Sequence, residues 1–400
     1  MTHSEPISPG FGLLLGADGL TGRRSGVGRV ILEAARLLRA DPAVADLRLL
    51  IGEAAESPDL LDRLDAVSSA PDRGLSPLRA ALSALPGLAR LRGLGVRRRL
   101  DRAAAEVAAR TGRPVLYHEM NAIARPFSGL TVVTVHDLSF RADPALHPPA
   151  RVAWMERRLP ATLRQASRFA AVSAFTKAEM VARLGVAPGL IDVVEPGLAA
   201  EFRPTAAEAA APVLARLGLG DRCYVLAVST LEPRKNFDRL LAAHLLLPAP
   251  LRNRFPLVVA GGRGWGRVLE GADAERAEAA GTLRLPGFLP DADLIALYGR
   301  AAVCAYPSLY EGFGLPALEA MACGTPLVTS ATSALADTAG DAALKVDPFD
   351  TEALSGALRR VLEDDALAND LRARGLVHVT RYTWTRMTQG LISCWRRALN

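Results

Sequence analysis

The sequence predicts an α/β protein that is built from two doubly wound parallel sheets. Three observations support this fold class. The chain has 400 residues, too many for one ordinary core and suitable for two domains of roughly 150 to 200 residues each. Half of the residues are hydrophobic, which suits large buried cores. Short runs rich in Val, Leu and Ala alternate with longer stretches of helical periodicity, and this alternation occurs in both halves of the chain.

Each half of the chain contains six candidate strands. In the first half they are residues 11–15, 47–51, 115–117, 131–135, 169–172 and 191–194. In the second half they are residues 224–229, 257–261, 282–285, 302–306, 326–329 and 343–346. Turn-forming residues separate the two sets, beginning with Glu195-Pro196-Gly197. We therefore expect a first domain over residues 1–198 and a second over residues 199–381.

Composition and charge indicate where the protein works and which kinds of partner it favours. No apolar run reaches about 18 residues, and the first ten residues lack an export signal, so we expect neither a membrane span nor secretion. The four cysteines have neither metal-binding nor redox spacing, which indicates free thiols in the cytoplasm. A net charge of +6 favours anionic partners such as phosphates or lipid headgroups. We expect no nucleic-acid partner.

The segment over residues 78–113 is basic and rich in leucine. Its leucines recur every three or four residues, while its arginines greatly outnumber its acidic residues. Pro86, Gly87, Gly93 and Gly95 interrupt this pattern, so we expect any continuous helix to be short. Two interpretations remain open. The segment is a loop with a solvated helix, or it is a surface that contacts an anionic membrane.

The strongest motif runs from Tyr310 to Gly324 and lies between two predicted strands, at the carboxyl edge of a sheet. Open α/β folds bind ligands at that edge. Gly312 and Gly314 allow backbone N–H groups to approach a ligand, and the free amides of the following helix attract anions. Glu311 and Glu319 are separated by seven residues, so their carboxylates could address two sugar rings.

This segment resembles the signature of glycosyltransferase family 4. The resemblance implies the GT-B fold, in which two Rossmann-like domains face each other across a cleft and the second binds a nucleotide sugar. It implies that Glu319 holds the nucleotide ribose and that Glu311 contacts the transferred sugar. The amides around Phe313, Gly314 and Leu315 would contact sugar and phosphate.

Arg234 and Lys235 are adjacent cations at a predicted junction between a strand and a helix. Such a pair suits a diphosphate, because lysine supplies a point charge and arginine a forked donor. Lys235 matches the phosphate-binding lysine of the family. Many members carry a further arginine near the position of Ser229 and Thr230, which is absent here. Arg234 either takes its place or points to solvent.

Further segments of the second half also match the family. Gly261 ends a strand and permits a tight turn beside a ligand. Phe288 and Leu289 resemble the segment that frames the nucleotide base. Residues 291–293 read Asp-Ala-Asp, which superficially matches a metal-binding motif, but we interpret them as a helix N-cap and a first-turn acid. No other cluster has ligand spacing, so we expect no cofactor and no catalytic metal.

In the first half, a predicted buried strand ends in His136 and Asp137. It resembles the family strand whose histidine points into the cleft. The resemblance implies that His136 either hydrogen-bonds the transferred sugar or helps to stabilise the transition state, and that Asp137 is an acceptor-side or orienting group. Gly26 and Gly28 lack the third glycine of a dinucleotide fingerprint. They resemble the glycine loop of the family near the donor diphosphate, although a plain turn remains an alternative. An amphipathic helix over about 382–400 is expected to cross back to the first domain.

These observations, taken with the resemblance, predict a metal-independent glycosyltransferase, and the resemblance implies that it retains the anomeric configuration. It would move a hexose from a nucleoside diphosphate sugar to a glycan or lipid-linked sugar in surface polysaccharide assembly, with mannose from GDP-mannose as the donor that the resemblance favours. Two alternatives remain at this point: a nucleotide-sugar epimerase of the same fold, and a non-catalytic nucleotide-sugar-binding protein.

Overall fold

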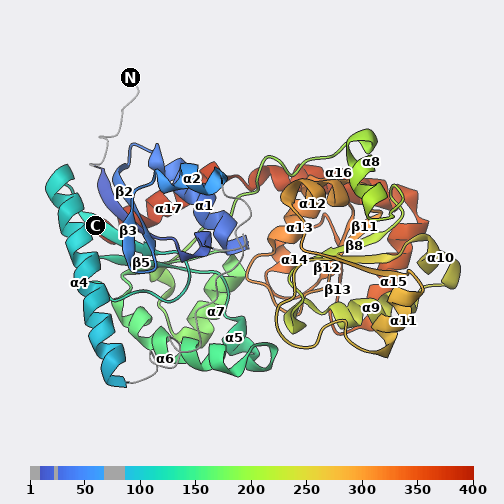
Figure 1. Cartoon of the computed structure of the whole chain (residues 1–400), viewed down its shortest axis with the longest axis horizontal. Coiled ribbons are helices and arrows are strands. Elements are labelled where there is room, and N and C mark those ends of the chain that lie inside the picture. The colour runs from blue at the N-terminus through green and yellow to red at the C-terminus, as the bar shows by residue number, and fades with distance from the viewer. Residues whose placement is uncertain (1–9, 22–25, 67–85) are drawn as a thin grey trace. The chain divides into compact units, whose positions relative to one another are not determined.

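The computed structural model describes residues 10–21, 26–66 and 86–400, and these form two compact α/β units (Figure 1). Unit 1 holds the chain up to His136, then Ala153–Gly197 and Trp384–Asn400. Unit 2 holds Asp137–Val152 and Leu198–Thr383. This division assigns residues 137–152 to unit 2, whereas the sequence placed them in the first domain.

Unit 1 is built on a seven-stranded sheet with the order β3-β2-β1-β4-β5-β6-β7. The strands are β1 (Phe11–Gly16), β2 (Val44–Ile51), β3 (Ala54–Glu56), β4 (Val115–Glu119), β5 (Thr131–Val135), β6 (Arg168–Ala171) and β7 (Ile191–Val193). All six expected strands are present and parallel. The additional β3 pairs antiparallel with β2. It has only three residues, so it carries no recognisable strand pattern.

The helices of unit 1 are α1 (Gly26–Arg39), α2 (Leu60–Ala66), α4 (Pro86–Thr111), α6 (Pro149–Gln165, which begins in unit 2), α7 (Ala174–Leu184) and α17 (Trp384–Leu399). Among the described residues, unit 1 also contains the 3-10 turns η1 (Asp18–Leu20) and η3 (Pro188–Leu190).

The C-terminal helix α17 packs into unit 1, as the sequence predicted. Its apolar positions recur at helical spacing and are buried. Trp395 is fully buried, lies edge-on to Phe11 at 5.7 Å and donates a hydrogen bond of 3.0 Å to Nδ1 of His118. Burial lowers the pKa of His118 to about 3, so its imidazole is neutral and can accept this bond. The chain end is thereby anchored in the core of unit 1.

Helix α4 is continuous over 26 residues, so the expectation that Pro86 and the glycines interrupt it was wrong. Pro86 is the first helical residue, where a missing N–H costs nothing. Leu100 and Val107 are buried against the sheet, and this packing outweighs the low helix propensity of the glycines. Residues 78–85 lie outside the described residues. No described helix has the length and apolarity that crossing a bilayer would require.

Unit 2 is built on a six-stranded parallel sheet with the order β10-β9-β8-β11-β12-β13. The strands are β8 (Val225–Val228), β9 (Leu257–Ala260), β10 (Leu283–Gly287), β11 (Val303–Tyr306), β12 (Leu327–Ser330) and β13 (Leu344–Val346), which correspond to the six expected ones. Four of them, β8, β9, β11 and β12, are buried along their whole length, which matches their continuous apolar runs.

The helices of unit 2 are α5 (Ser139–Ala142), α8 (Ala207–Arg216), α9 (Phe237–Leu245), α10 (Ala249–Arg254), α11 (Ala272–Ala279), α12 (Asp291–Arg300), α13 (Leu315–Ala322), α14 (Leu335–Thr338), α15 (Thr351–Glu363) and α16 (Asp365–His378). The 3-10 turns are η2 (Pro144–Leu146), η4 (Pro233–Lys235) and η5 (Val379–Arg381). Helices α12, α13 and α16 cover one face of the sheet, and α9, α11 and α15 cover the other (Figure 1).

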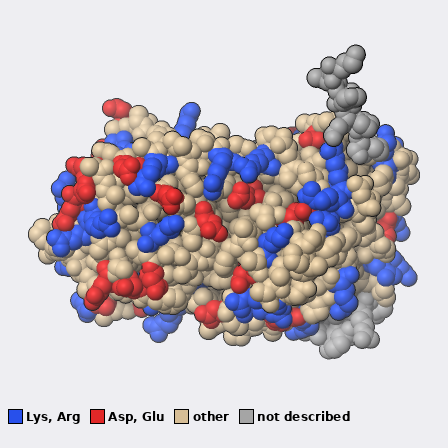
Figure 2. Space-filling model, turned by 180° about the vertical axis from the view of Figure 1, so that it is seen from behind, with Lys and Arg blue, Asp and Glu red and all other residues tan. Residues whose placement is uncertain are grey.

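Surface charge is mixed on the face shown in Figure 2. There the Lys and Arg side chains lie interspersed with Asp and Glu side chains. Neither sign of charge forms a single block on this face.

Candidate functional site

The candidate site of unit 2 is formed by loops that follow three adjacent strands. Strand β8 lies between β9 and β11, and all three are parallel. Their carboxyl ends therefore share one edge of the sheet. The loop after β8 contains Lys235, the loop after β9 contains Gly261, and the loop after β11 contains Glu311. The topology alone thus brings together three segments that are far apart in the sequence.

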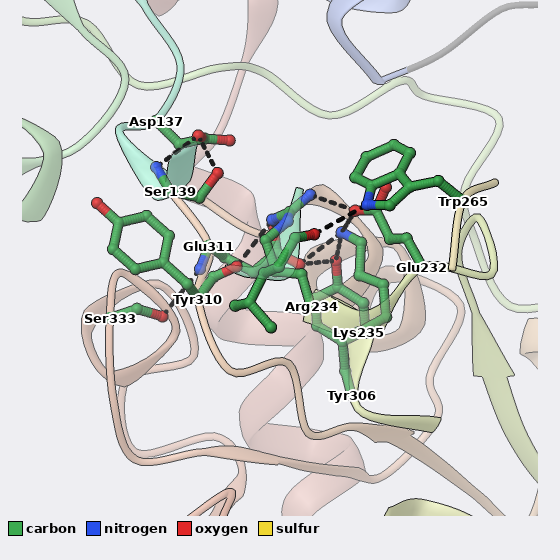
Figure 3. A network of polar contacts seen from close by, with 11 residues as sticks. Asp137, Ser139, Glu232, Arg234, Lys235, Trp265, Tyr306, Tyr310, Glu311 and Ser333 are labelled. Atoms are coloured by element: carbon green, nitrogen blue, oxygen red, sulfur yellow. Dashed lines mark hydrogen bonds and ion pairs between the residues drawn. The ribbon is translucent and has the colours of Figure 1, made fainter. Parts of the chain in front are cut away.

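Lys235 and Glu311 form a buried ion pair at this edge (Figure 3). Lys235 Nζ lies 2.6 Å from Glu311 Oε1, and the hydroxyl of Tyr306 donates to the same oxygen at 2.7 Å. Lys235 Nζ also donates to the Tyr306 hydroxyl at 3.2 Å. Both charged residues are only 7% exposed, so solvent screens their interaction poorly. The sequence placed both in the site, and the structure joins them directly.

Arg234 holds the other oxygen of Glu311. Its Nη1 donates to Glu311 Oε2 and to the carbonyl oxygen of Tyr310, both at 2.7 Å, while Nη2 donates to Glu232 Oε1 at 2.7 Å. The side chain is only 11% exposed, so the alternative that it points to solvent was wrong. Its Nε is buried and has no hydrogen-bond partner among the described residues.

The charges of this cluster fix the protonation of Glu311. Burial raises the pKa of its carboxyl, but the positive charges of Arg234 and Lys235 outweigh burial and lower the pKa to about 2. Burial lowers the pKa of Lys235, and the neighbouring Arg234 charge lowers it further. Glu311 is therefore a carboxylate at neutral pH, which accepts hydrogen bonds and has no proton to give.

Backbone geometry after β8 holds the two cations in place. Asn236 adopts the left-handed conformation with φ 63°, which asparagine tolerates better than most residues. Its side-chain amide donates to the carbonyl oxygens of Pro307 at 3.0 Å and Pro348 at 2.7 Å. Asn236 thereby ties the loop after β8 to the loop after β11.

The N-terminus of α13 lies directly after Glu311 in the chain. Gly314 is its N-cap and has φ 104°, a conformation that favours glycine, and a Cβ there would lie 2.5 Å from Leu335 Cδ2. Gly312 and Phe313 are buried in this loop, and Leu315 begins the helix. One turn into α13, the buried Glu319 accepts a hydrogen bond of 3.2 Å from the Tyr298 hydroxyl.

The remaining donor-side predictions in unit 2 have mixed outcomes. A Cβ on Gly261 would lie 1.8 Å from the carbonyl oxygen of Ser229, so close backbone packing already accounts for this glycine. Phe288 is 50% exposed after β10, and Leu289 is half-buried beside it. Asp291 is the first residue of α12 and Pro290 is its N-cap, so the predicted acidic N-cap was wrong.

Asp293, the second acid of the Asp-Ala-Asp segment, forms an ion pair with Arg216. Within the residues that the structure describes, no group of three or more His, Cys, Asp or Glu side chains has an arrangement that could hold a metal ion.

Asp137 belongs to unit 2 and lies close to the cation cluster. Its Oδ1 accepts hydrogen bonds from the backbone N–H of Ser139 at 3.0 Å and from the Ser139 hydroxyl at 2.6 Å (Figure 3). Burial raises the pKa of Asp137, but the charge of Arg234 and the two Ser139 bonds outweigh it, so the pKa is lowered. Asp137 is therefore an anion beside Arg234.

Three predicted residues lie in unit 1. His136 follows β5, and its Nε2 is 2.7 Å from the carbonyl oxygen of Met120. Gly26 and Gly28 lie in the first turn of α1, where Gly26 is exposed and Gly28 is buried. Both glycines are helical rather than part of a loop, and their predicted roles near the donor diphosphate remain predictions.

Sequence reasoning missed several members of the cluster, namely Glu232, Tyr306, Asn236 and Ser333, whose hydroxyl accepts from the Glu311 backbone N–H at 3.1 Å. A signal was present for Tyr306, because a hydroxyl at the carboxyl end of a buried strand needs a polar partner. In unit 1 the buried Glu119 was also missed, at the end of β4 beside Arg125 at 3.0 Å.

Comparison with known proteins places this geometry in a family. The family described as Glycosyltransferase Family 4 matches residues 24–202, and the one described as Glycosyl transferases group 1 matches residues 215–376. O-antigen chain mannosyltransferase B of Escherichia coli is 33% identical over 372 residues, which cover 93% of this chain and 96% of that protein.

Two solved structures share the fold at low sequence identity. Sucrose-phosphate synthase from Thermosynechococcus elongatus has a TM-score of 0.66 and 20% identity, covering 97% of this chain and 99% of its own. HepE from Anabaena, in complex with UDP-glucose, has a TM-score of 0.68 and 17% identity, covering 96% and 99%. The family matches and the full-length relative agree with the motif around Glu311. The chain belongs to glycosyltransferase family 4 and is a glycosyltransferase.

Proposed function

We propose that this glycosyltransferase moves a hexose from a nucleoside diphosphate sugar to a hydroxyl of a glycan or lipid-linked sugar during surface polysaccharide assembly, and that its donor is GDP-mannose. The observation that carries the proposal is the buried pairing of Lys235 and Arg234 with Glu311 at the carboxyl edge of the unit 2 sheet, directly before the N-terminus of α13. The Escherichia coli relative is an O-antigen chain mannosyltransferase, which supports the choice of sugar and pathway.

The cluster is suited to a sugar diphosphate because it presents both signs of charge. Lys235, Arg234 and the free amides at the start of α13 would stabilise the negative charge that develops on the departing diphosphate. The unpartnered Nε of Arg234 offers one donor without breaking an existing bond. Glu311 stays ionised, so its role would be to accept hydrogen bonds from hydroxyls of the transferred sugar.

The proposed reaction breaks the bond between the anomeric carbon and the diphosphate oxygen and forms a bond from that carbon to an acceptor oxygen. The acceptor proton would pass to the departing phosphate oxygen, which keeps the exchange balanced without a separate base. Attack on the same face as the leaving group would retain the anomeric configuration. NMR of the anomeric proton in the product distinguishes retention from inversion.

A panel of sugar nucleotides tests the donor. Ligand binding to the native state raises the melting temperature by mass action. We expect GDP-mannose to give the largest shift and to support transfer to a mannose-terminated acceptor. A larger shift and faster transfer with UDP-glucose would overturn the assignment of the donor while leaving glycosyl transfer intact. Formation of an epimer from sugar nucleotide alone would instead support the epimerase alternative, which none of the relatives reported above favours.

We further propose that transfer needs no metal, because side-chain cations and helix amides are placed to take the role that a divalent ion has elsewhere. Unchanged turnover after treatment with EDTA is the expected result. Recovery of lost turnover by added Mg²⁺ or Mn²⁺ would refute it.

Helix α4 is our candidate for contact with an anionic membrane at the cytoplasmic face. Leu94 is 44% exposed, and Arg97 and Arg98 are exposed next to it, while Arg99 pairs with Glu53. We expect cosedimentation with anionic liposomes to fall when Arg97, Arg98 and Arg99 are replaced by glutamine. The matched control neutralises three exposed arginines of unit 2: Arg276, Arg359 and Arg374. An equal loss in both variants would show nonspecific charge attraction only.

A further inference from the structure

His147 is a buried histidine in the segment 137–152 of unit 2, and neither of its ring nitrogens has a hydrogen-bond partner among the described residues. The residue is only 6% exposed. Burying a polar group without a partner is unfavourable, and most buried polar atoms in native proteins are paired. An imidazole held in this state is a candidate for pairing with a bound molecule.

The position of His147 is fixed by Trp265 from the loop after β9. The two rings pack with their centroids 5.7 Å apart and their planes tilted by 32°. Trp265 Nε1 donates to the carbonyl oxygen of Leu146 at 2.8 Å, and the guanidinium of Arg151 lies 5.3 Å from the Trp265 ring centroid. Trp265 therefore contacts the chain on both sides of His147, at Leu146 and at Arg151.

This pair lies near the cluster around Glu311. A Cβ added to Gly266, next to Trp265, would lie 2.7 Å from Pro233 Cγ, and Pro233 precedes Arg234. Figure 3 labels Trp265 in the same close-up as Arg234 and Lys235. Burial lowers the pKa of His147, the charges of Asp137 and Asp143 raise it, and those of Arg234 and Arg151 lower it, with a net lowering. The imidazole is therefore neutral at pH 7 and has one N–H donor and one nitrogen acceptor.

We propose that His147 is a donor-binding residue whose neutral imidazole hydrogen-bonds a hydroxyl of the transferred hexose, beside Trp265. A hydroxyl both donates and accepts and so matches a neutral imidazole, whereas a phosphate oxygen at neutral pH only accepts. The nearby anion Asp137 also disfavours a phosphate at this point. The inference rests on the proposed function, because it takes a sugar nucleotide as the donor, and it names which part of that donor His147 contacts.

The test uses two variants of the full chain. His147→Phe keeps an aromatic ring against Trp265 and removes both nitrogens, and His147→Gln keeps one donor and one acceptor. Calorimetry measures the Kd for GDP-mannose and for GDP, which lacks the hexose. Because a neutral hydrogen bond contributes about 1 kcal/mol, we expect GDP-mannose to bind about five- to tenfold more weakly to His147→Phe. GDP should bind within about twofold of wild type, and His147→Gln should recover part of the loss.

The melting temperature without ligand separates this role from a structural one. Removing unpartnered buried nitrogens should leave the melting temperature unchanged or raise it in His147→Phe. The control is His244→Phe, because His244 is also buried but its Nε2 lies 2.8 Å from the carbonyl oxygen of Phe255. That control should melt at a lower temperature and bind GDP-mannose as wild type does.

Each contrary result has a distinct meaning. Equal GDP-mannose affinity in wild type and His147→Phe would overturn the inference and leave the proposed function standing. Equal losses of affinity for GDP and GDP-mannose would overturn it, because they would show that His147 contacts the nucleotide diphosphate or only supports the fold. Wild-type protein that binds no sugar nucleotide of the panel would overturn the proposed function and this inference together.

Discussion

At the scale of single residues, the site concentrates buried charge. Glu311 is shared by two cations, and Arg234 is shared by two carboxylates, so every formal charge has an opposite neighbour. Such a network is strongly coupled, because removing one member leaves its partner buried and uncompensated. The same coupling makes the residues sensitive reporters of function, provided that each variant is checked for folding.

The first prediction concerns Lys235. Replacing it by alanine removes a cation that would stabilise the departing diphosphate. We therefore expect kcat/KM for the donor to fall roughly 30- to 1000-fold, which corresponds to a loss of about 2 to 4 kcal/mol of transition-state stabilisation. Lys345 in the same unit is exposed, and Lys345→Ala is the matched control, with no expected change. Steady-state kinetics on folded protein measure both. Wild-type kcat/KM in Lys235→Ala would refute its role.

The second prediction concerns the charge of Glu311. Glu311→Gln keeps the size of the side chain but releases Lys235 and Arg234 from a carboxylate that is ionised at neutral pH. We expect turnover to fall about 100-fold or more, because a hydrogen-bond acceptor for the transferred sugar is weakened. Binding of GDP alone should be equal or tighter, since two cations become available to phosphate. Weaker GDP binding with normal turnover would reverse the assigned roles of these residues.

At the scale of elements, apolar runs predicted the strands, whereas the extent of helix α4 was decided by tertiary packing. The six strands of unit 2 all appear where the sequence placed them, because a buried parallel strand reads as a continuous apolar run. Helix α4 was wrongly divided, since its glycines lower helix propensity while Leu100 and Val107 supply the packing that holds it. Propensity is local and packing is not, so such errors arise wherever the two disagree.

In the candidate site, too, some residues could be predicted from local sequence and others depend on tertiary contacts. Lys235, Glu311 and Gly314 could be placed from the sequence because motif and strand end coincide there. Glu232 could not, because nothing in the chain shows that its side chain turns toward Arg234, two residues away. The strand-end hydroxyl of Tyr306 signalled a polar partner, but its contact with Lys235 depends on β8 and β11 being neighbours in the sheet. His147 was missed for a related reason, since its significance lies in the partners that it lacks.

The third prediction tests the entrance of α13. Gly314→Ala must adopt φ 104° and place a Cβ against Leu335, so we expect a loss of stability of about 1 to 3 kcal/mol together with weaker donor binding. Gly356 is exposed within α15, and an added Cβ there meets no atom within 4 Å. Gly356→Ala should therefore stabilise the protein by about 0.5 to 1 kcal/mol. Urea unfolding compares the stability of the two variants. Equal changes in the free energy of unfolding would show that the left-handed backbone of Gly314 does not require glycine.

At the scale of the whole molecule, the two units are joined by a chain that passes between them repeatedly. Unit 1 is assembled from three stretches of sequence, and its core depends on the last one, through Trp395 of α17. Unit 1 therefore cannot be complete until the end of the chain is present. Tryptophan fluorescence reports mainly on unit 1, because Trp154, Trp384 and Trp395 belong to unit 1 and only Trp265 belongs to unit 2.

The fourth prediction uses Glu119, a buried carboxyl of unit 1 at the end of β4. Burial raises its pKa to about 7, although Arg125 and the Tyr117 hydroxyl act in the opposite direction. A raised pKa means that the folded state binds this proton more tightly than the unfolded state. Its contribution to stability is therefore complete below the ordinary pKa of 4.5 and is lost as the pH rises to about 7.

We accordingly expect the unfolding free energy of unit 1, followed by tryptophan fluorescence in urea, to lose up to about 3 kcal/mol from this group between pH 4.5 and 7.5. Glu119→Gln cannot ionise, so its stability should decline less steeply over that range, and the difference between the two profiles isolates Glu119 from every other titrating group. Parallel profiles would show that Arg125 holds the carboxyl ionised in the folded state. A steeper decline in the variant would contradict the sign of the pKa shift itself.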